Sequence, residues 1–229
     1  MPQGEEFVLS PSDSKVLLGS FRKSSLLFIK EKFFRFEELL GEDKPAWLRA
    51  FRDGHFAIFR LTPEKYHYNH TPVAGKVVDF YEIPGVYHSC NPGALICVPH
   101  PYSKNRRAVT VFQTDTAGGT GAGLVAMIEV VALMIGDISK AYSENQYTAP
   151  SPLRREMFVR RGQPKSLFCP GSSTVILIFQ RGRVDFCPDL IANRHFSSAQ
   201  TRFSADWKFP LVETEVKVRS PIARAELKK

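Results

Sequence analysis

An unbroken apolar segment in the last third of the chain constrains the fold most strongly. Residues Thr174 to Phe179 are all β-branched or apolar, and they lie between Pro170-Gly171 and Arg181-Gly182. A run of this kind, bounded by turn residues, is typical of a strand buried inside a sheet. Ser172 and Ser173 stand at its entrance, where a hydroxyl can attack a neighbouring carbonyl if a base removes its proton. Small residues before a strand more often form only a turn.

The length of 229 residues allows one substantial core. We predict one α+β domain over residues 1–229, rich in β-strands and containing a few short helices. Apolar residues at helical intervals predict two short helices between Phe36 and Phe51, and Tyr142 to Arg154 is expected to be a loop. The remaining expected strands are Glu6 to Leu9, Lys15 to Leu18, a pair in Ser25 to Phe34, Phe56 to Leu61, Val73 to Tyr81, Ile83 to Tyr87, Ala94 to Val98, Ala108 to Phe112, a pair in Leu124 to Ile138, and Met157 to Arg160.

The charge and cysteine patterns narrow the class of protein. The 31 Lys and Arg against 23 Asp and Glu give a net charge of +8, which suits an anionic surface but also an ordinary solvated one. The four cysteines show no CxxC spacing, so we expect reduced thiols and no metal. The glycine-rich residues Gly119 to Gly123 lack a complete GxGxxG, and we expect neither a nucleotide cofactor nor a nucleic-acid partner.

No targeting or membrane-spanning segment is visible in the sequence. Residues Met1 to Glu6 are not a basic region followed by an apolar one. The most apolar stretch, Leu124 to Ile138, is shorter than the roughly 18 to 20 residues of a membrane span and contains Glu129 and Asp137. We expect an intracellular protein, cytoplasmic or peripheral on a membrane, without a transmembrane segment.

Two histidines lie close together in the middle of the chain. Thr62 suits a helix N-cap and Pro63 the first helical position, which predicts one helical turn that delivers His67 and His70. Side chains three residues apart on a helix point to roughly the same side, so both rings could share a site. A surface pair, a half-built metal site and a structurally satisfied histidine are the alternatives.

The segment from Arg60 to Val77, which contains both histidines, resembles the signature of the phosphatidylserine decarboxylase family of self-cleaving, pyruvoyl-containing enzymes. The resemblance extends from about Val8 to Phe186. Further segments similar to those of the family follow in the same order: Pro11 to Ser14, Lys32 with Phe36 to Gly41, Tyr87 to Pro92, Asn105 to Arg107, and Gly162 to Phe179.

The resemblance implies a reaction and gives roles to individual residues. Ser173 would attack the carbonyl of Ser172, the ester would eliminate, and the new N-terminus would hydrolyse to a pyruvoyl group. His70 matches the family's base and Asp13 its orienting aspartate, while His67 matches a histidine near the substrate. The pyruvoyl group would form a Schiff base with the substrate amine, so neither pyridoxal phosphate nor a metal is required.

The resemblance also implies that cleavage between residues 172 and 173 leaves two intertwined chains. Matching the Ser-Thr-Val-Ile run selects Ser173 as the pyruvoyl precursor, because the strand fixes the register, whereas matching from Gly171 selects Ser172. Three positions depart from the family pattern, with Ser14 and Ser172 where the family usually has glycine and Gly171 where it has an apolar residue.

The implied activity is conversion of phosphatidylserine to phosphatidylethanolamine. The family's N-terminal membrane-associating segment is not recognised in this sequence, which favours a soluble amino acid such as tryptophan as the alternative substrate. The basic surface favours peripheral membrane contact and hence the lipid. The alternative from a different function class is a lipid-binding relative of the family that does not catalyse a reaction. The sequence does not decide whether the protein forms a homo-oligomer.

Overall fold

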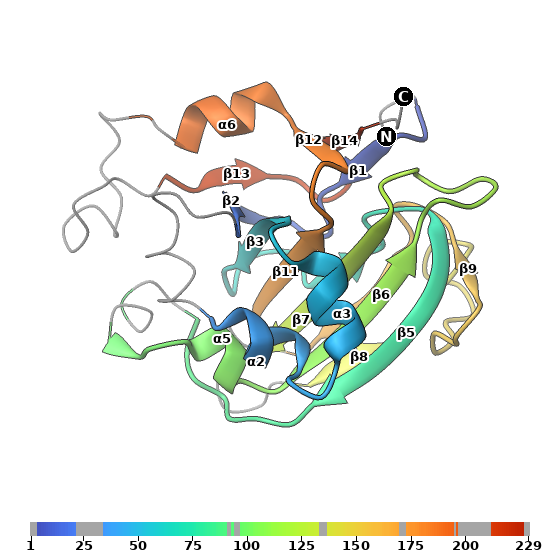
Figure 1. Ribbon diagram of the computed structural model, residues 1–229. Coiled ribbons are helices and arrows are strands. Elements are labelled where there is room, and N and C mark those ends of the chain that lie inside the picture. The colour runs from blue at the N-terminus through green and yellow to red at the C-terminus, as the bar shows by residue number, and fades with distance from the viewer. Residues whose placement is uncertain are drawn as a thin grey trace.

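The apolar run forms strand β11 (Ser173–Phe179), and all seven of its residues are buried. The computed structural model describes residues 4–21, 34–90, 93, 97–132, 137–169, 173–194, 196 and 212–226. Strand β11 lies inside an antiparallel eight-stranded sheet (Figure 1), between strands that precede it in the sequence. The order across the sheet is β13 (Thr214–Val216), β2 (Ser14–Ser20), β3 (His55–Leu61), β11, β7 (Leu124–Val131), β6 (Arg107–Gln113), β5 (Gly75–Ile83) and β9 (Phe158–Val159).

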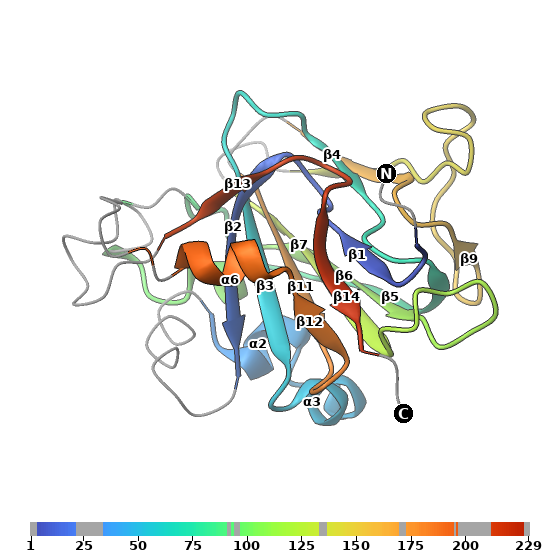
Figure 2. The same ribbon diagram turned by 90° about the horizontal axis from the view of Figure 1, so that it is seen from above.

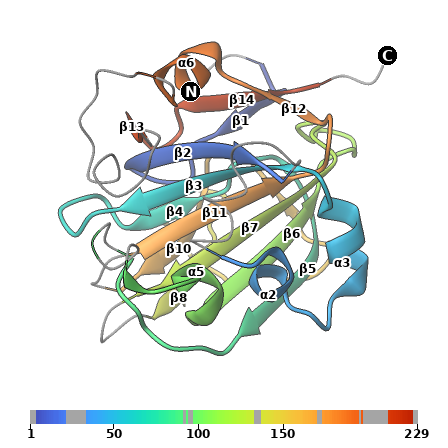
Figure 3. The same ribbon diagram turned by 60° about the vertical axis from the view of Figure 1, so that its left-hand side comes forward.

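Short helices cover one face of this sheet, as Figure 3 shows. They are α2 (Phe36–Leu40), α3 (Pro45–Phe51) and α5 (Pro101–Lys104). Ile176 and Ile178 of β11 belong to the apolar cluster on this face, together with Leu39 of α2 and Phe51 of α3. Residues two apart on a strand share a face, so this cluster uses the even-numbered positions of β11.

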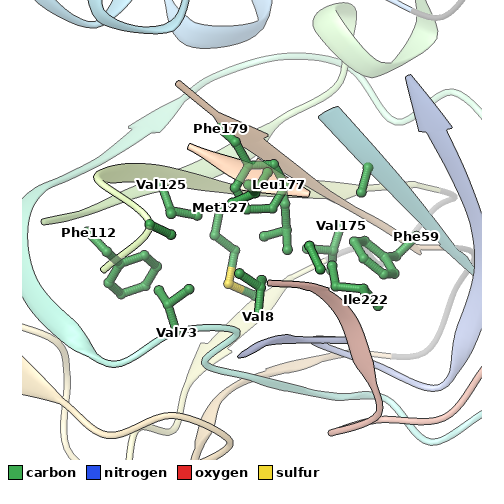
Figure 4. Packing of buried hydrophobic residues seen from close by; sticks show 14 of the residues in the cluster. Val8, Phe59, Val73, Phe112, Val125, Met127, Val175, Leu177, Phe179 and Ile222 are labelled. Atoms are coloured by element: carbon green, nitrogen blue, oxygen red, sulfur yellow. The ribbon is translucent and has the colours of Figure 1, made fainter. Parts of the chain in front are cut away.

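Two small antiparallel sheets contribute to the cluster on the opposite face. One has the order β4 (Tyr68–His70), β10 (Pro164–Phe168) and β8 (Ile138–Lys140), and the other β1 (Phe7–Leu9), β14 (Pro221–Ala225) and β12 (Val184–Phe186). Figure 4 shows Val175, Leu177 and Phe179 packed in one cluster with Val8 and Ile222 from the second small sheet. Helix α6 (Pro188–Arg194) lies beside β2 and β13 (Figure 2), and its Leu190 belongs to the same cluster. Strand β11 is therefore buried from both sides, which explains why its sequence does not alternate.

The predicted fold class is confirmed, because the structure is a single, mostly β-stranded domain with four short helices among the described residues. The two helices between Phe36 and Phe51 and most of the expected strands are present. The pair of strands expected in Ser25 to Phe34 falls almost entirely on residues outside the described part. So does most of the strand expected from Ala94 to Val98, although Cys97, which is described, is helical.

Three local predictions are wrong. The helical turn expected after Thr62 is a non-helical turn closed by the Lys65 N–H on the Thr62 carbonyl at 3.0 Å, and His70 lies on strand β4. Strand β5 ends at Ile83, and only an isolated bridge follows at Val86. The segment from Leu124 contains one long strand, β7, whereas β8 pairs with β10 in another sheet, because the chain crosses between sheets after β7.

A buried carboxylate joins the large sheet to the sheet that carries β4. Glu129 of β7 is 0 % exposed and forms an ion pair with Lys165 of β10. Its other oxygen accepts hydrogen bonds from Ser166 and, at 3.0 Å, from Asn69 Nδ2 of β4. A register irregularity between Pro164 and Ser166 lets two consecutive residues reach the same carboxylate. A cavity of about 20 Å³ beside this group has room for one water molecule.

We predict that Glu129→Gln lowers the free energy of unfolding by about 3 to 5 kcal/mol, because it leaves the Lys165 ammonium buried without a counter-charge. The double variant Glu129→Gln/Lys165→Met should recover most of this loss. Urea unfolding measures both, in a Ser173→Ala background that removes the serine expected to start self-cleavage.

The control is Glu156→Gln, which removes an exposed ion pair with Lys76 and should change stability by about 0 to 1 kcal/mol. Equal stability of Glu129→Gln and Glu156→Gln would contradict the role given to the buried pair.

Candidate active site

Ser173 opens strand β11 and is 1 % exposed. It lies opposite Leu61 of β3 and Val131 of β7. Its side chain shares a face with Val175, two residues along, and Val175 is paired with Glu129. Because the Glu129 carboxylate is bonded to β4 and β10, Ser173 points to the face of the sheet on which these two strands lie.

The segment from Leu61 to His70 carries both histidines. It lies beside β10, which ends just before residues 169–172, and beside the start of β11, which follows them. It begins at Leu61, the partner of Ser173. It continues to His67, whose carbonyl accepts a hydrogen bond from the Phe168 N–H at 3.1 Å. Strand β4 then pairs with β10, with His70 opposite Pro164. The pairing of β4 with β10 therefore places His67 beside Phe168, five residues before Ser173, and His70 opposite Pro164, nine residues before Ser173, although both histidines are about a hundred residues from Ser173 in sequence.

His70 is 1 % exposed, and both of its ring nitrogens are engaged. Nδ1 lies 2.9 Å from the carbonyl oxygen of Gly162 and must donate to it, because a carbonyl only accepts. Nε2 therefore carries the lone pair, and it accepts from the Tyr66 hydroxyl at 2.9 Å. Burial lowers the pKa of His70 to about 4, assisted by the charge of Arg219, while the Gly162 hydrogen bond and Asp13 oppose this shift. The ring is thus neutral at physiological pH, as a general base must be.

Gly162 has φ 74°, a conformation that glycine adopts readily. Its carbonyl accepts a second hydrogen bond from Arg219 Nε at 2.8 Å. Asp13 Oδ1 accepts from the Val218 N–H at 2.7 Å, so the carboxylate is held beside the same loop. The hydrogen bond that fixes the tautomer of His70 is accepted by the Gly162 carbonyl, while Asp13 acts on the ring through its charge. The part of Asp13 in the reaction stays a prediction.

His67 is positioned differently. Its Nδ1 donates to the Lys65 carbonyl, which leaves the lone pair on Nε2. Among the described residues Nε2 is buried and has no hydrogen-bond partner. A buried nitrogen without a partner is unfavourable, so Nε2 is open to a polar group from outside the described residues.

The sequence did not reveal Gly162, Arg219 or Tyr66 as neighbours of His70. Gly162 lies within a segment that resembles the family, but a glycine in a loop carries no sign that its carbonyl binds an imidazole. Arg219 lies in a part of the chain that gave no pattern, and it is brought near by the pairing of β13 with β2 before it and of β14 with β1 after it.

Other possible reactive groups are sparse. All four cysteines, Cys90, Cys97, Cys169 and Cys187, are free. Over the described ranges, no three His, Cys, Asp or Glu side chains are grouped so that they could hold a metal ion. None of the described helices has the length and apolar character needed to cross a membrane.

Comparison with known proteins defines the class. Residues 1–203 match the family model for phosphatidylserine decarboxylase. A phosphatidylserine decarboxylase proenzyme of Fusobacterium nucleatum is 29 % identical over 206 residues, which are 90 % of this chain and 62 % of the relative. One of Ruminiclostridium cellulolyticum is 32 % identical over 188 residues, which are 82 % of this chain and 57 % of the relative. Proenzyme 2 of Oryza sativa is 33 % identical over 186 residues, which are 80 % of this chain and 27 % of the relative.

The chain therefore belongs to the phosphatidylserine decarboxylase family. It spans about three fifths of the length of the two bacterial relatives and about a quarter of the rice protein.

We predict that His70 makes stability depend on pH between its unfolded pKa of 6.5 and its folded pKa of about 4. In this window the unfolded chain binds a proton that the folded chain does not, so stability falls as the pH falls and levels off below about 4. The contribution amounts to about 3 kcal/mol at most.

The comparison is Ser173→Ala with Ser173→Ala/His70→Gln, since glutamine can donate to Gly162 but does not titrate. The difference between their urea midpoints should shrink or reverse as the pH falls through the window. Parallel pH profiles would show that His70 does not have a lowered pKa.

Proposed function

We propose that this chain is a self-processing, pyruvoyl-dependent carboxy-lyase that converts phosphatidylserine to phosphatidylethanolamine. Membership of the family and the names of the relatives support the reaction class. The observation that carries the proposal is the position of Ser173. It is a buried serine at the end of a central strand, and it faces the side of the sheet on which the histidine-bearing strand lies.

The first step is cleavage of the bond between Ser172 and Ser173. Ser173 Oγ bonds to the carbonyl carbon of Ser172 and the amide C–N bond breaks, so the amide becomes an ester and a free amine. Loss of the Ser173 Cα proton then expels the Ser172 carboxylate. Hydrolysis of the remaining enamine gives a ketone and ammonia. In total one water is consumed and one ammonia leaves.

His70 and its neighbours suit the base required by these steps. A neutral ring with its lone pair on Nε2 can accept the Ser173 proton, and the Gly162 carbonyl holds the tautomer. The Asp13 charge stabilises the imidazolium that forms, since it raises the pKa of His70. The buried site excludes bulk water that would compete with Ser173 for the carbonyl.

The residues around Ser173 fit the group that it would become. The serine is shielded from solvent between Leu61 and Val131, so a small carbonyl group would be kept from water. Once formed, that group supplies a carbonyl that condenses with the substrate amine and withdraws electrons as carbon dioxide leaves. His67 would bind the substrate through its free Nε2, where it can hold the carboxylate or deliver a proton.

The topology would hold the two cleaved chains together. Strand β11, the first of the smaller chain, lies between β3 and β7 of the larger one. Strand β14 pairs with β1, and β13 pairs with β2. Residues 1–172 and 173–229 would therefore share two sheets after cleavage.

Substitutions should separate the two histidines. His70→Ala should remain uncleaved because Ser173 loses its base, and Asp13→Asn should be cleaved slowly. His67→Ala should be cleaved normally, with decarboxylation reduced by roughly 10² or more. Gel analysis after expression and release of carbon dioxide measure the two steps.

Two serine variants test the cleavage position. Ser173→Ala should stay intact, whereas Ser172→Ala should still be cleaved. Normal maturation of His70→Ala, or cleavage of Ser173→Ala, would sink the assignment.

The substrate prediction is tested with liposomes. We expect carbon dioxide from phosphatidylserine liposomes and none from free tryptophan. We also propose peripheral contact with anionic lipid through basic residues such as the exposed Arg154 and Arg160, worth about 1 kcal/mol each near the surface. Liposome binding should then weaken at high salt. Release from tryptophan alone, by a protein that binds the liposomes, would reverse the choice of substrate.

A further inference from the structure

The base His70 is cut off from bulk water, which poses a problem for any reaction that leaves a proton on it. The ring is 1 % exposed, and Nδ1 is committed to Gly162. Elimination of the ester puts the Cα proton of Ser173 on the base as the Ser172 carboxylate leaves. The whole reaction releases no net proton, because the ammonia formed later departs as ammonium, but the proton on His70 still has to be passed on before the base is restored. The lone pair on Nε2 is the only place on the ring where that proton can be held.

A tyrosine hydroxyl lies at this nitrogen. The Tyr66 oxygen is 2.9 Å from Nε2, and Tyr66 must donate because Nε2 carries no proton. Burial raises the pKa of Tyr66, and the hydrogen bond to Tyr147 adds to this shift, so the phenol stays protonated. Tyr66 is therefore a stable neutral donor.

A second tyrosine continues the chain to solvent. The hydroxyl of Tyr147 lies 2.5 Å from that of Tyr66. Since the Tyr66 proton points to His70, Tyr147 is the donor in this contact. Tyr147 is 50 % exposed, so its oxygen can exchange protons with water. The order from the interior to the surface is His70 Nε2, Tyr66, Tyr147 and water.

Aromatic contacts fix this arrangement. Tyr66 stacks on Tyr68 with ring centroids 5.5 Å apart, and Tyr68 meets Tyr147 edge to face at 5.2 Å. The rings of Tyr66 and His70 are 5.7 Å apart. Rings packed in this way keep both hydroxyls in line without relying on the hydrogen bonds alone.

We propose that Tyr66 and Tyr147 form a proton relay between His70 and solvent during self-processing. The inference rests on the proposed function. The two hydroxyls first rotate, so that Tyr66 donates to Tyr147 and Tyr147 donates to water. The imidazolium then gives its Nε2 proton to the Tyr66 oxygen, the Tyr66 proton passes to Tyr147, and the Tyr147 proton passes to water. These transfers restore the starting orientations, with one proton released and no change in either tyrosine.

The contact between the Tyr66 hydroxyl and His70 Nε2 also has the opposite interpretation, in which Tyr66 only caps the base, that is, blocks its lone pair. A hydroxyl that donates to Nε2 competes with Ser173 for the lone pair. A cap predicts faster cleavage when the hydroxyl is removed, whereas a relay predicts slower cleavage. The sign of one rate change therefore decides between them.

The experiment uses three hydroxyl deletions that keep the rings: Tyr66→Phe, Tyr147→Phe and Tyr68→Phe. The rate of cleavage of newly translated chain is measured in H2O and in D2O. We expect Tyr66→Phe and Tyr147→Phe to slow cleavage about tenfold or more and to change the solvent isotope effect. The double variant should be no slower than Tyr66→Phe, because either deletion interrupts the same path. Tyr68→Phe, which shares the packing but not the relay, should match the wild type.

Faster cleavage of Tyr66→Phe would overturn the relay in favour of a cap. Equal slowing by Tyr68→Phe and Tyr147→Phe would assign the effect to packing. An unchanged isotope effect in the slowed variants would also contradict proton transfer through the hydroxyls.

A second measurement separates the relay from the proposed function. In uncleavable Ser173→Ala, the ¹⁵N chemical shift of His70 Nε2 reports whether it accepts a hydrogen bond. We expect a clear change with Tyr66→Phe and none with Tyr68→Phe. Lack of change with Tyr66→Phe would overturn the relay even if the wild type is cleaved. A wild-type chain that stays intact would instead overturn the proposed function, and with it the use of the relay.

Discussion

Burial of strand β11 on both faces is the constraint on which the rest of the structure depends. Each of its seven residues is paired with both β3 and β7, and none reaches solvent. Ser173 therefore cannot shift along the sheet without moving the whole apolar strand off both clusters, since a one-residue slip exchanges the faces. A reactive serine at the end of such a strand is held in a fixed place, and the same pairing would keep the chain after residue 173 attached once the preceding bond is cut.

The buried Glu129 carboxylate links strand β11 and its neighbours to the segment that carries the histidines, so the two are fixed relative to each other. It is paired in register with Val175, and it holds Asn69, the residue before His70, from across the two sheets. An apolar contact would allow the small sheet to slide over the large one, whereas a buried ion pair with Lys165 has one geometry in which its charges are satisfied. The placement of His70 relative to Ser173 thus depends on polar groups that lie outside the proposed site.

The sequence predicted the parts of the fold that follow from local pattern. The apolar run after Ser173 defined β11, and the periodic spacing between Phe36 and Phe51 defined two helices. The turn after Thr62 was predicted as a helix because an N-cap residue followed by proline is compatible with a helix and with a turn. The pairing of Tyr68 with Leu167 then makes the following residues a strand. The Glu129–Lys165 pair and the tyrosine contacts join residues far apart in sequence, so no local pattern could reveal them. Family resemblance selected His67, His70, Asp13 and Ser173 as candidates, but not the Gly162 carbonyl that accepts a hydrogen bond from His70 Nδ1.

The central claim is that Ser173, fixed by β11, is the residue at which the chain opens. Intact mass of the purified protein, followed by sequencing of both fragments, tests it most directly. The account predicts a larger fragment of residues 1–172 that ends in a free carboxylate. The smaller fragment should cover residues 173–229, be lighter by one ammonia than the corresponding peptide, and resist N-terminal sequencing because a ketone replaces its amine. A single intact chain with decarboxylase activity, or a small fragment that begins at residue 172, would contradict it.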